Sequence, residues 1–87
     1  ADFANANLVQ AQLNQCLLGG ANFRGAVLVG AKIMKSDAME ACFEGARLSH
    51  ADLRGTSFFA AAFWEAVTDG AAWELADLRR TLLDGET

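Results

Sequence analysis

The large apolar residues of this chain recur every five positions. Within residues 21–35, alanines stand at 21, 26 and 31, and Phe23, Leu28 and Ile33 each follow an alanine by two residues. An α-helix repeats its apolar positions about every 3.6 residues and a β-strand every second residue, so neither element explains this spacing. The pattern therefore predicts a repeat structure whose unit is five residues long.

The five-residue frame runs through the whole chain. Seventeen units fit between residues 1 and 85 without an insertion, and residues 86 and 87 follow them. The first position is alanine in thirteen units, and the third is leucine or phenylalanine in thirteen. Seven of the eight glycines stand at the fifth position, and the chain has no proline. We expect one domain over residues 1–87, because nothing interrupts the frame.

These preferences are explained if each unit forms one side of a square coil. A small first residue meets the backbone across a narrow interior, and a large apolar third residue fills the remaining space. The second, fourth and fifth positions carry mostly polar residues and glycine, which are typical of solvated surface and of turns. Stacked coils would bond to one another through the backbone groups that the corners leave unpaired.

A coil of four units brings residues twenty apart into register. Phe3, Phe23, Phe43 and Phe63 then form one ladder inside the coil, which Leu83 would continue. Three departures from alanine at the first position lie on another face with the same spacing, and they are Cys16, Ser36 and Thr56. A little over four coils, spaced about 4.8 Å apart like neighbouring strands, predict a pillar roughly 20 Å tall.

The segments "ANL" at 6–8, "ANF" at 21–23, and "ADL" at 51–53 and 76–78 carry a family resemblance. They resemble the A-(D/N)-L-x-x motif of the pentapeptide-repeat family, and the resemblance covers essentially the whole chain. It implies an all-β fold, a right-handed quadrilateral parallel β-helix of about four coils. The small first residue and the central leucine or phenylalanine lie inside in this family.

Residues 69–85 carry a second pattern, which is typical of a helix that caps a solenoid. Leu75, Leu78 and Leu82 fall on one helical face, and Gly85 could end the helix. The five-residue frame nevertheless continues through the segment, although Trp73 is bulky for a narrow coil. We expect more β-helix here and keep a capping helix over 69–85 as the alternative.

The residues that could carry chemistry are better explained as surface. Ser49, His50 and Asp52 are adjacent in sequence, but they straddle one corner and point outward, whereas a catalytic triad needs convergent side chains. With Cys16 inward and Cys42 outward, the single histidine completes no tetrahedral metal site. We therefore predict no catalytic residue, no cofactor, no metal site and no small-molecule substrate, and we interpret the chain as a non-enzymatic protein.

The outward apolar residues favour a structural or protein-interaction module. Met39, Phe59 and Trp64 all occupy fourth positions, and we expect them to form one patch around a corner that binds a partner protein or a second copy of the chain. The bland alternative is that Phe59 and Trp64 lie over neighbouring backbone. If binding lies elsewhere, the next candidates are on one other face: Val9, Val27 and Val29.

The family resemblance also implies an alternative function, DNA mimicry by an acidic rod that binds topoisomerase. Duplex DNA carries about one charge per 1.7 Å, so a 20 Å mimic needs roughly twelve negative charges. The net charge is only −4, and six acids gather in residues 61–87. We therefore expect no nucleic-acid partner, and mimicry stays an alternative for a chain that is part of a longer protein.

No stretch of the sequence predicts a transmembrane segment, since the longest apolar run covers only residues 58–64. The chain begins with Ala1 and no signal peptide is recognisable, so we expect a processed protein or a fragment. The resembled family is abundant in cyanobacteria and plastids, which suggests a photosynthetic setting. The compartment stays open between the cytoplasm and the thylakoid lumen.

Overall fold

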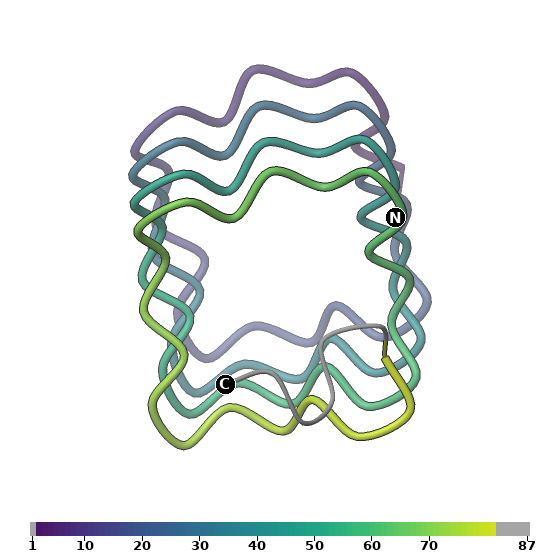
Figure 1. Ribbon diagram of the computed structural model, residues 1–87, viewed down its shortest axis with the longest axis vertical. Helices are drawn as coiled ribbons and strands as arrows, with labels where there is room; N and C mark the ends of the chain where they lie inside the picture. The colour runs from purple at the N-terminus through teal and green to yellow at the C-terminus, as the bar shows by residue number, and fades with distance from the viewer. Residues whose placement is uncertain (1, 82–87) are drawn as a thin grey trace.

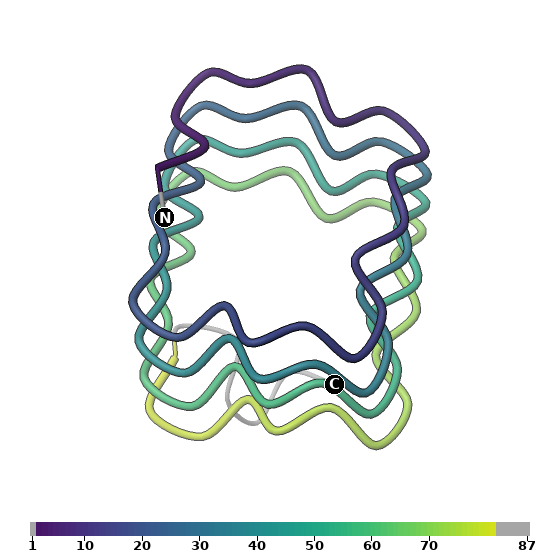
Figure 2. The same ribbon diagram turned by 180° about the vertical axis from the view of Figure 1, so that it is seen from behind.

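The computed structural model describes residues 2–81, and these residues wind into a coil with four sides. Seen down the shortest axis, the backbone traces stacked squares, and the view from behind shows the same arrangement (Figures 1 and 2). The molecule measures 29 × 23 × 19 Å, and the shortest extent lies along the coil axis. This height agrees with the pillar expected from the repeat.

Four faces and four coils describe every position in the solenoid. The coils comprise residues 2–20, 21–40, 41–60 and 61–80. Face 1 contains 2–5, 21–25, 41–45 and 61–65; face 2 contains 6–10, 26–30, 46–50 and 66–70. Face 3 contains 11–15, 31–35, 51–55 and 71–75; face 4 contains 16–20, 36–40, 56–60 and 76–80.

Neighbouring coils are joined by single-residue parallel bridges at the second position of each unit. Within residues 2–81 there is no helix and no strand longer than one bridge residue. Every bridge joins residues twenty apart: Asp2–Asn22, Asn7–Val27, Gln12–Lys32, Leu17–Asp37, Asn22–Cys42, Val27–Arg47, Lys32–Asp52, Asp37–Ser57, Cys42–Ala62, Arg47–Val67, Asp52–Ala72 and Ser57–Asp77. The predicted register of four units to a coil is confirmed.

Backbone hydrogen bonds between coils follow the same repeat. The N–H groups of Phe23 and Gly25 donate to the carbonyls of Cys42 and Glu44 in the next coil, at 2.7 and 2.9 Å. The N–H of Cys42 donates in the opposite direction to the carbonyl of Ala21, at 2.9 Å. Each pair of stacked units is therefore joined by three bonds, and backbone polar groups are satisfied without extended strands.

The corners explain the preference for glycine at the fifth position. This residue has a positive φ in every described unit, from 55° at Lys35 to 70° at Gly20. At most corners the next first-position N–H closes a turn onto the third-position carbonyl, as Ala26 does onto Phe23 at 3.0 Å. Glycine adopts such a φ without steric cost, whereas other residues are strained there.

The predicted phenylalanine ladder forms the interior of face 1. The rings of Phe3, Phe23, Phe43 and Phe63 stack with centroid distances of 4.9, 4.8 and 5.2 Å and interplanar angles of at most 11°. Phe58 meets the rings of Phe43 and Phe63 edge-on, at 5.6 Å in each case. The ladder is therefore confirmed up to Phe63, and its expected continuation at position 83 lies outside the described residues.

The β-helix continues through residues 69–81, as we expected. Trp73 turns the edge of its indole toward Phe58 and Phe63, at centroid distances of 5.7 and 5.8 Å. The bulky side chain is thus accommodated beside the phenylalanines, and a capping helix is wrong for residues 69–81. The remainder of that alternative, over 82–85, lies outside the described residues.

The corner between faces 3 and 4 departs from the others because hydroxyl groups enter its turns. The Ser36 hydroxyl donates to the carbonyl of Leu13 at 2.6 Å and accepts from the N–H of Cys16 at 3.1 Å. The Thr56 hydroxyl likewise donates to the carbonyl of Ile33 and accepts from the N–H of Ser36 at 3.2 Å. Each hydroxyl thus bridges the N–H and the carbonyl that close the turn directly at other corners, and this turn belongs to the preceding coil.

We expect Thr56→Val to destabilise the protein more than Thr56→Ala. Valine keeps the shape of threonine but leaves the Ile33 carbonyl and the Ser36 N–H unpaired in a buried position, at a cost of about 1–3 kcal/mol. Alanine leaves room for the turn to close directly, as it does at other corners. Urea unfolding of both variants measures this difference, and an equal or larger loss for Thr56→Ala would contradict the bridging role.

Candidate protein-binding surface

Met39 and Phe59 lie on the same corner, between faces 4 and 1, in adjacent coils. Met39 has 42% of its surface exposed. Phe59 is half-buried, and the guanidinium of Arg79 in the next coil lies over its ring, 5.3 Å from the centroid. One side of this ring is thus covered by the Arg79 side chain, which neither interpretation of the sequence had considered.

Arg79 is held in place over Phe59 by an ion pair within its own unit. Its Nε and Nη2 donate to the two carboxylate oxygens of Asp77, at 2.9 and 2.8 Å. These hydrogen bonds keep the pKa of Asp77 below its ordinary value, first through the Arg79 side chain and then through the Arg79 backbone N–H. Met39, Phe59 and Arg79 thus form one row of sulfur, ring and cation along the corner.

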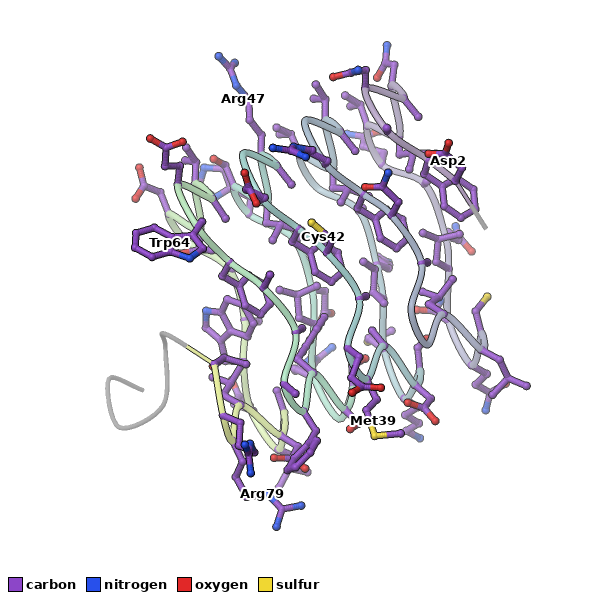
Figure 3. All side chains as sticks on the ribbon, turned by 90° about the vertical axis from the view of Figure 1, so that its right-hand side faces the viewer. Asp2, Met39, Cys42, Arg47, Trp64 and Arg79 are labelled. Atoms are coloured by element: carbon purple, nitrogen blue, oxygen red, sulfur yellow. The ribbon has the colours of Figure 1, made fainter. Side chains whose placement is uncertain are left out.

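Trp64 has 62% of its surface exposed and stands at the other end of its face 1 unit. Figure 3 shows Trp64 separated from Met39 and Arg79. The indole lines a shallow hollow of about 340 Å³ together with Ala60 and Arg80, which directly follow Phe59 and Arg79 in the sequence. The register of the coils thus stacks Met39 and Phe59 at the same position, and Trp64 lies across a hollow from that row.

Two exposed leucines were missed by the sequence reasoning. Leu17 is 89% exposed on face 4, and Leu75 is 93% exposed at the corner between faces 3 and 4. Both stand at outward positions of the repeat, the second and the fifth, where most units carry polar residues or glycine. A search for large apolar residues at all three outward positions would have found them.

The histidine and the two cysteines considered for chemistry lie on different faces of the coil. His50 is exposed at a corner with a φ of 59°, and its ring packs beside Gly70, where an added Cβ would come within 2.6 Å of Nδ1. Cys16 and Cys42 are both partly buried free thiols. Within residues 2–81, no three His, Cys, Asp or Glu side chains gather as metal ligands. The same part of the chain contains no helix suited to crossing a membrane.

A family model for pentapeptide repeats matches residues 1–37, 20–55 and 41–63, with eight copies of the repeat. Together these matches extend over residues 1–63, most of the chain. No curated protein matches the sequence.

Solved structures of similar fold come from cyanobacteria, plants and a plasmid. The pentapeptide repeat protein Rfr23 of the cyanobacterium Cyanothece matches with a TM-score of 0.85 and 25% identity, over 87% of this chain and 52% of its own. A pentapeptide repeat protein of the Arabidopsis thaliana thylakoid lumen matches with a TM-score of 0.59 and 25% identity, over 86% of this chain and 56% of its own. QnrB1, a plasmid-mediated fluoroquinolone resistance protein, matches with a TM-score of 0.51 and 26% identity, over 92% of this chain and 47% of its own. This chain therefore spans about half the length of these proteins, and its coil is the right-handed quadrilateral β-helix that they share.

Proposed function

The chain belongs to the pentapeptide repeat family, and we propose that it is a non-enzymatic module that docks another protein. The docking surface is the corner patch, which we define as Met39, Phe59, Trp64 and Arg79. The observation that carries the proposal is the exposure of Trp64, whose side chain is 62% accessible on a coil that is hydrogen-bonded to the coil before it. Aromatic side chains, tryptophan above all, and arginine are the groups that most often anchor protein interfaces.

The rigid backbone beneath the patch favours binding. Phe59 and Trp64 sit on units whose carbonyls accept bonds from the preceding coil, at 2.8 Å from Glu40 N to Phe59 O and 2.8 Å from Gly45 N to Trp64 O. Side chains held on such a coil lose little backbone freedom when a partner binds, so less of the interaction energy is spent on ordering. The buried ladder of phenylalanines fixes the positions of the outward residues in turn.

The distribution of charge argues against the DNA-mimic alternative. Three carboxylates are paired with arginines, in Glu44–Arg24 at 2.9 Å, Asp52–Arg54 at 2.7 Å and Asp77–Arg79 at 2.8 Å. These pairs lie on faces 1, 3 and 4 and interrupt any acidic stripe along the pillar. A duplex mimic needs an unbroken row of negative charge, so mimicry stays an alternative only for a longer parent chain.

A variant at Trp64 tests the docking proposal. Trp64→Ser should keep the circular dichroism of the folded protein, because the indole is mostly exposed, and should lose the captured partner in a pull-down from native extract. The double change Phe59→Ser with Trp64→Ser should abolish capture completely. Val9→Ser is the matched control, since Val9 is another exposed apolar residue at a fourth position.

Quantitative mass spectrometry of the captured proteins decides the result. We expect one protein to fall at least tenfold with Trp64→Ser and to stay unchanged with Val9→Ser. Undiminished capture by the folded Trp64→Ser variant would contradict the proposal. Loss of a dimer in sedimentation, without loss of any other protein, would identify a second copy of the chain as the partner.

A further inference from the structure

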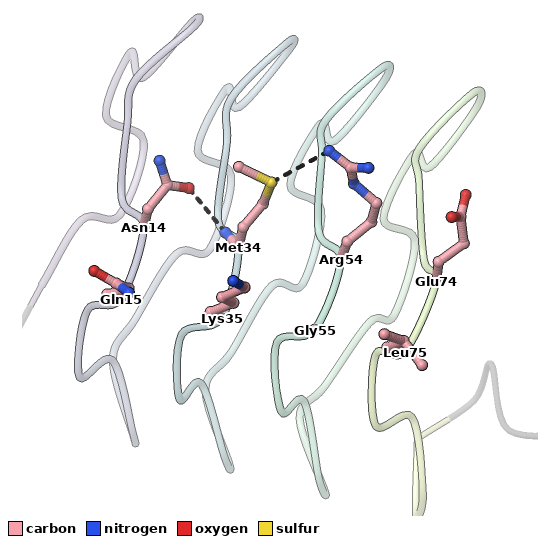
Figure 4. Close-up of a pocket in the computed structure, with 8 residues that line it drawn as sticks. All are labelled: Asn14, Gln15, Met34, Lys35, Arg54, Gly55, Glu74 and Leu75. Atoms are coloured by element: carbon pink, nitrogen blue, oxygen red, sulfur yellow. Dashed lines mark hydrogen bonds between the residues drawn. The ribbon is translucent and has the colours of Figure 1, made fainter.

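A groove of about 530 Å³ runs across all four coils at the corner between faces 3 and 4 (Figure 4). Its lining comes from the fourth and fifth positions of each face 3 unit, and the side chains that matter most are Met34, Lys35, Arg54 and Leu75. This corner is separate from the patch proposed above, which extends from the corner between faces 4 and 1 across face 1 to Trp64. The groove therefore requires its own explanation.

The groove lies at the corner where the hydroxyls of Ser36 and Thr56 enter the turns. Because each hydroxyl stands between the two ends of a turn, the chain at Lys35 bends without the direct bond that tightens other corners. Gly55 in the next coil adds no side chain to the groove. The same sequence features that depart from the alanine repeat therefore coincide with the hollow.

Leu75 supplies an independent sign of binding at the end of the groove. Its φ is +63°, in the left-handed region that is costly for a residue with a Cβ, and its side chain is 93% exposed. Ten of the sixteen described fifth positions carry a residue other than glycine at a similar φ, so this backbone conformation is shared along the solenoid and is not specific to Leu75. What distinguishes Leu75 is a large apolar side chain that is almost fully exposed, which contributes little to folding but would contribute to an apolar contact with a ligand.

The charges beside the groove favour an anionic ligand. Lys32 and Lys35 lie on face 3 in the second coil, and Arg54 follows in the third, although the whole chain has a net charge of −4. Asp52 accepts from Nε and Nη2 of Arg54 at 2.7 Å each, and Met34 Sδ accepts from Nη2 at 3.5 Å. Arg54 is thus paired with Asp52, and Glu74 lines the groove in the fourth coil, so the excess of positive charge beside the groove lies in the second coil, at Lys32 and Lys35.

We propose that this groove binds an extended peptide segment of another protein, with an acidic side chain near Lys35 and an apolar side chain against Leu75. Lys35 and Leu75 are two coils apart, about 10 Å at the spacing of neighbouring strands. An extended chain rises about 3.3 Å per residue, so the acidic and apolar residues of the ligand stand about three residues apart. Glu74 beside Leu75 disfavours a second acid at the apolar end.

Fluorescence anisotropy with three synthetic peptides tests this inference on the protein at low salt. The first peptide carries two glutamates followed, after two glycines, by two leucines; the second replaces the glutamates by lysines, and the third replaces the leucines by serines. We expect the first peptide to bind at least tenfold more tightly than either of the others. Equal binding of the serine peptide would overturn the peptide groove, because it would show attraction of anions alone.

Variants locate the binding on the protein. Lys35→Glu should weaken the first peptide at least tenfold, whereas Arg47→Glu, the same change of charge at an exposed position on face 2, should alter its affinity less than twofold. Leu75→Gly should weaken binding while it raises the melting temperature, because it removes both the apolar contact and the strained φ. A change that merely damaged the fold would lower both quantities.

Three further outcomes would overturn the proposal: no binding of the first peptide at millimolar concentration, equal losses with Lys35→Glu and Arg47→Glu, or self-association of the protein that Leu75→Gly abolishes while peptide binding is absent. The last result would assign the groove to a second copy of the chain. Trp64→Ser should leave peptide binding unchanged, so that failure of this inference is distinguishable from failure of the docking patch.

Discussion

Phe43→Ala is expected to lower the free energy of unfolding by about 3–5 kcal/mol. Phe43 is fully buried in the third coil, where its ring stacks between Phe23 at 4.8 Å and Phe63 at 5.2 Å. Phe58 packs edge-on against it at 5.6 Å, so alanine would leave a cavity bounded by three aromatic rings. The coil cannot collapse into this space, because backbone bonds to both neighbouring coils hold it open.

Thermal and urea unfolding of Phe43→Ala measure this loss, and Phe3→Ala is the matched control. Phe3 belongs to the same ladder but is only half-buried and stacks on one ring alone among the described residues, at 4.9 Å from Phe23. Its replacement should therefore cost less. A loss within about 0.5 kcal/mol for Phe43→Ala, which is typical of surface sites, would contradict the central place of the ladder.

Ala46→Leu is expected to overpack the coil and to cost about 1–3 kcal/mol or more. Ala46 is a first-position residue with no exposed surface, and Ala26 and Ala66 occupy the same position in the coils on either side. The neighbouring residues are already small and at least partly buried, so they leave no room for a leucine side chain at this position. Arg47→Leu places a leucine at the next position, where the side chain is exposed, and this change should be tolerated.

The yield of soluble, folded protein and the melting temperature of both leucine variants give the comparison. We expect Ala46→Leu to show the lower value in each measurement. Equal values, or a reversed order, would mean that the first and second positions do not point inward and outward as the structure places them.

The sequence predicts the interior of this protein well because the repeat leaves few choices. A small residue and a large apolar residue recur in each unit, so a shift of one position would expose Phe23 and bury Arg24. The period of twenty then places the phenylalanines in one column, and the structure confirms it. The handedness of the coil came from the family resemblance, since no spacing of residues distinguishes a right turn from a left one.

The outer surface was harder to predict because it depends on corners rather than on the repeat. The spacing of Ser36 and Thr56 showed that they share a face, but spacing does not show that their hydroxyls enter the turns of the preceding coil. Leu75 was missed because fifth positions were treated as turns, although one of them exposes a leucine. The repeat placed Phe59 above Met39, but it did not reveal that Arg79 covers the ring.

Site-specific photocrosslinking beside the intact Trp64 tests the docking function most directly. A photoreactive phenylalanine derivative replaces Met39 in one sample and Val9 in the other, and both proteins are irradiated in native extract. We expect a single crosslinked protein from position 39 that is absent from position 9, because of these two positions only 39 belongs to the corner patch. The same set of crosslinks from both positions, or none from position 39, would contradict the docking function.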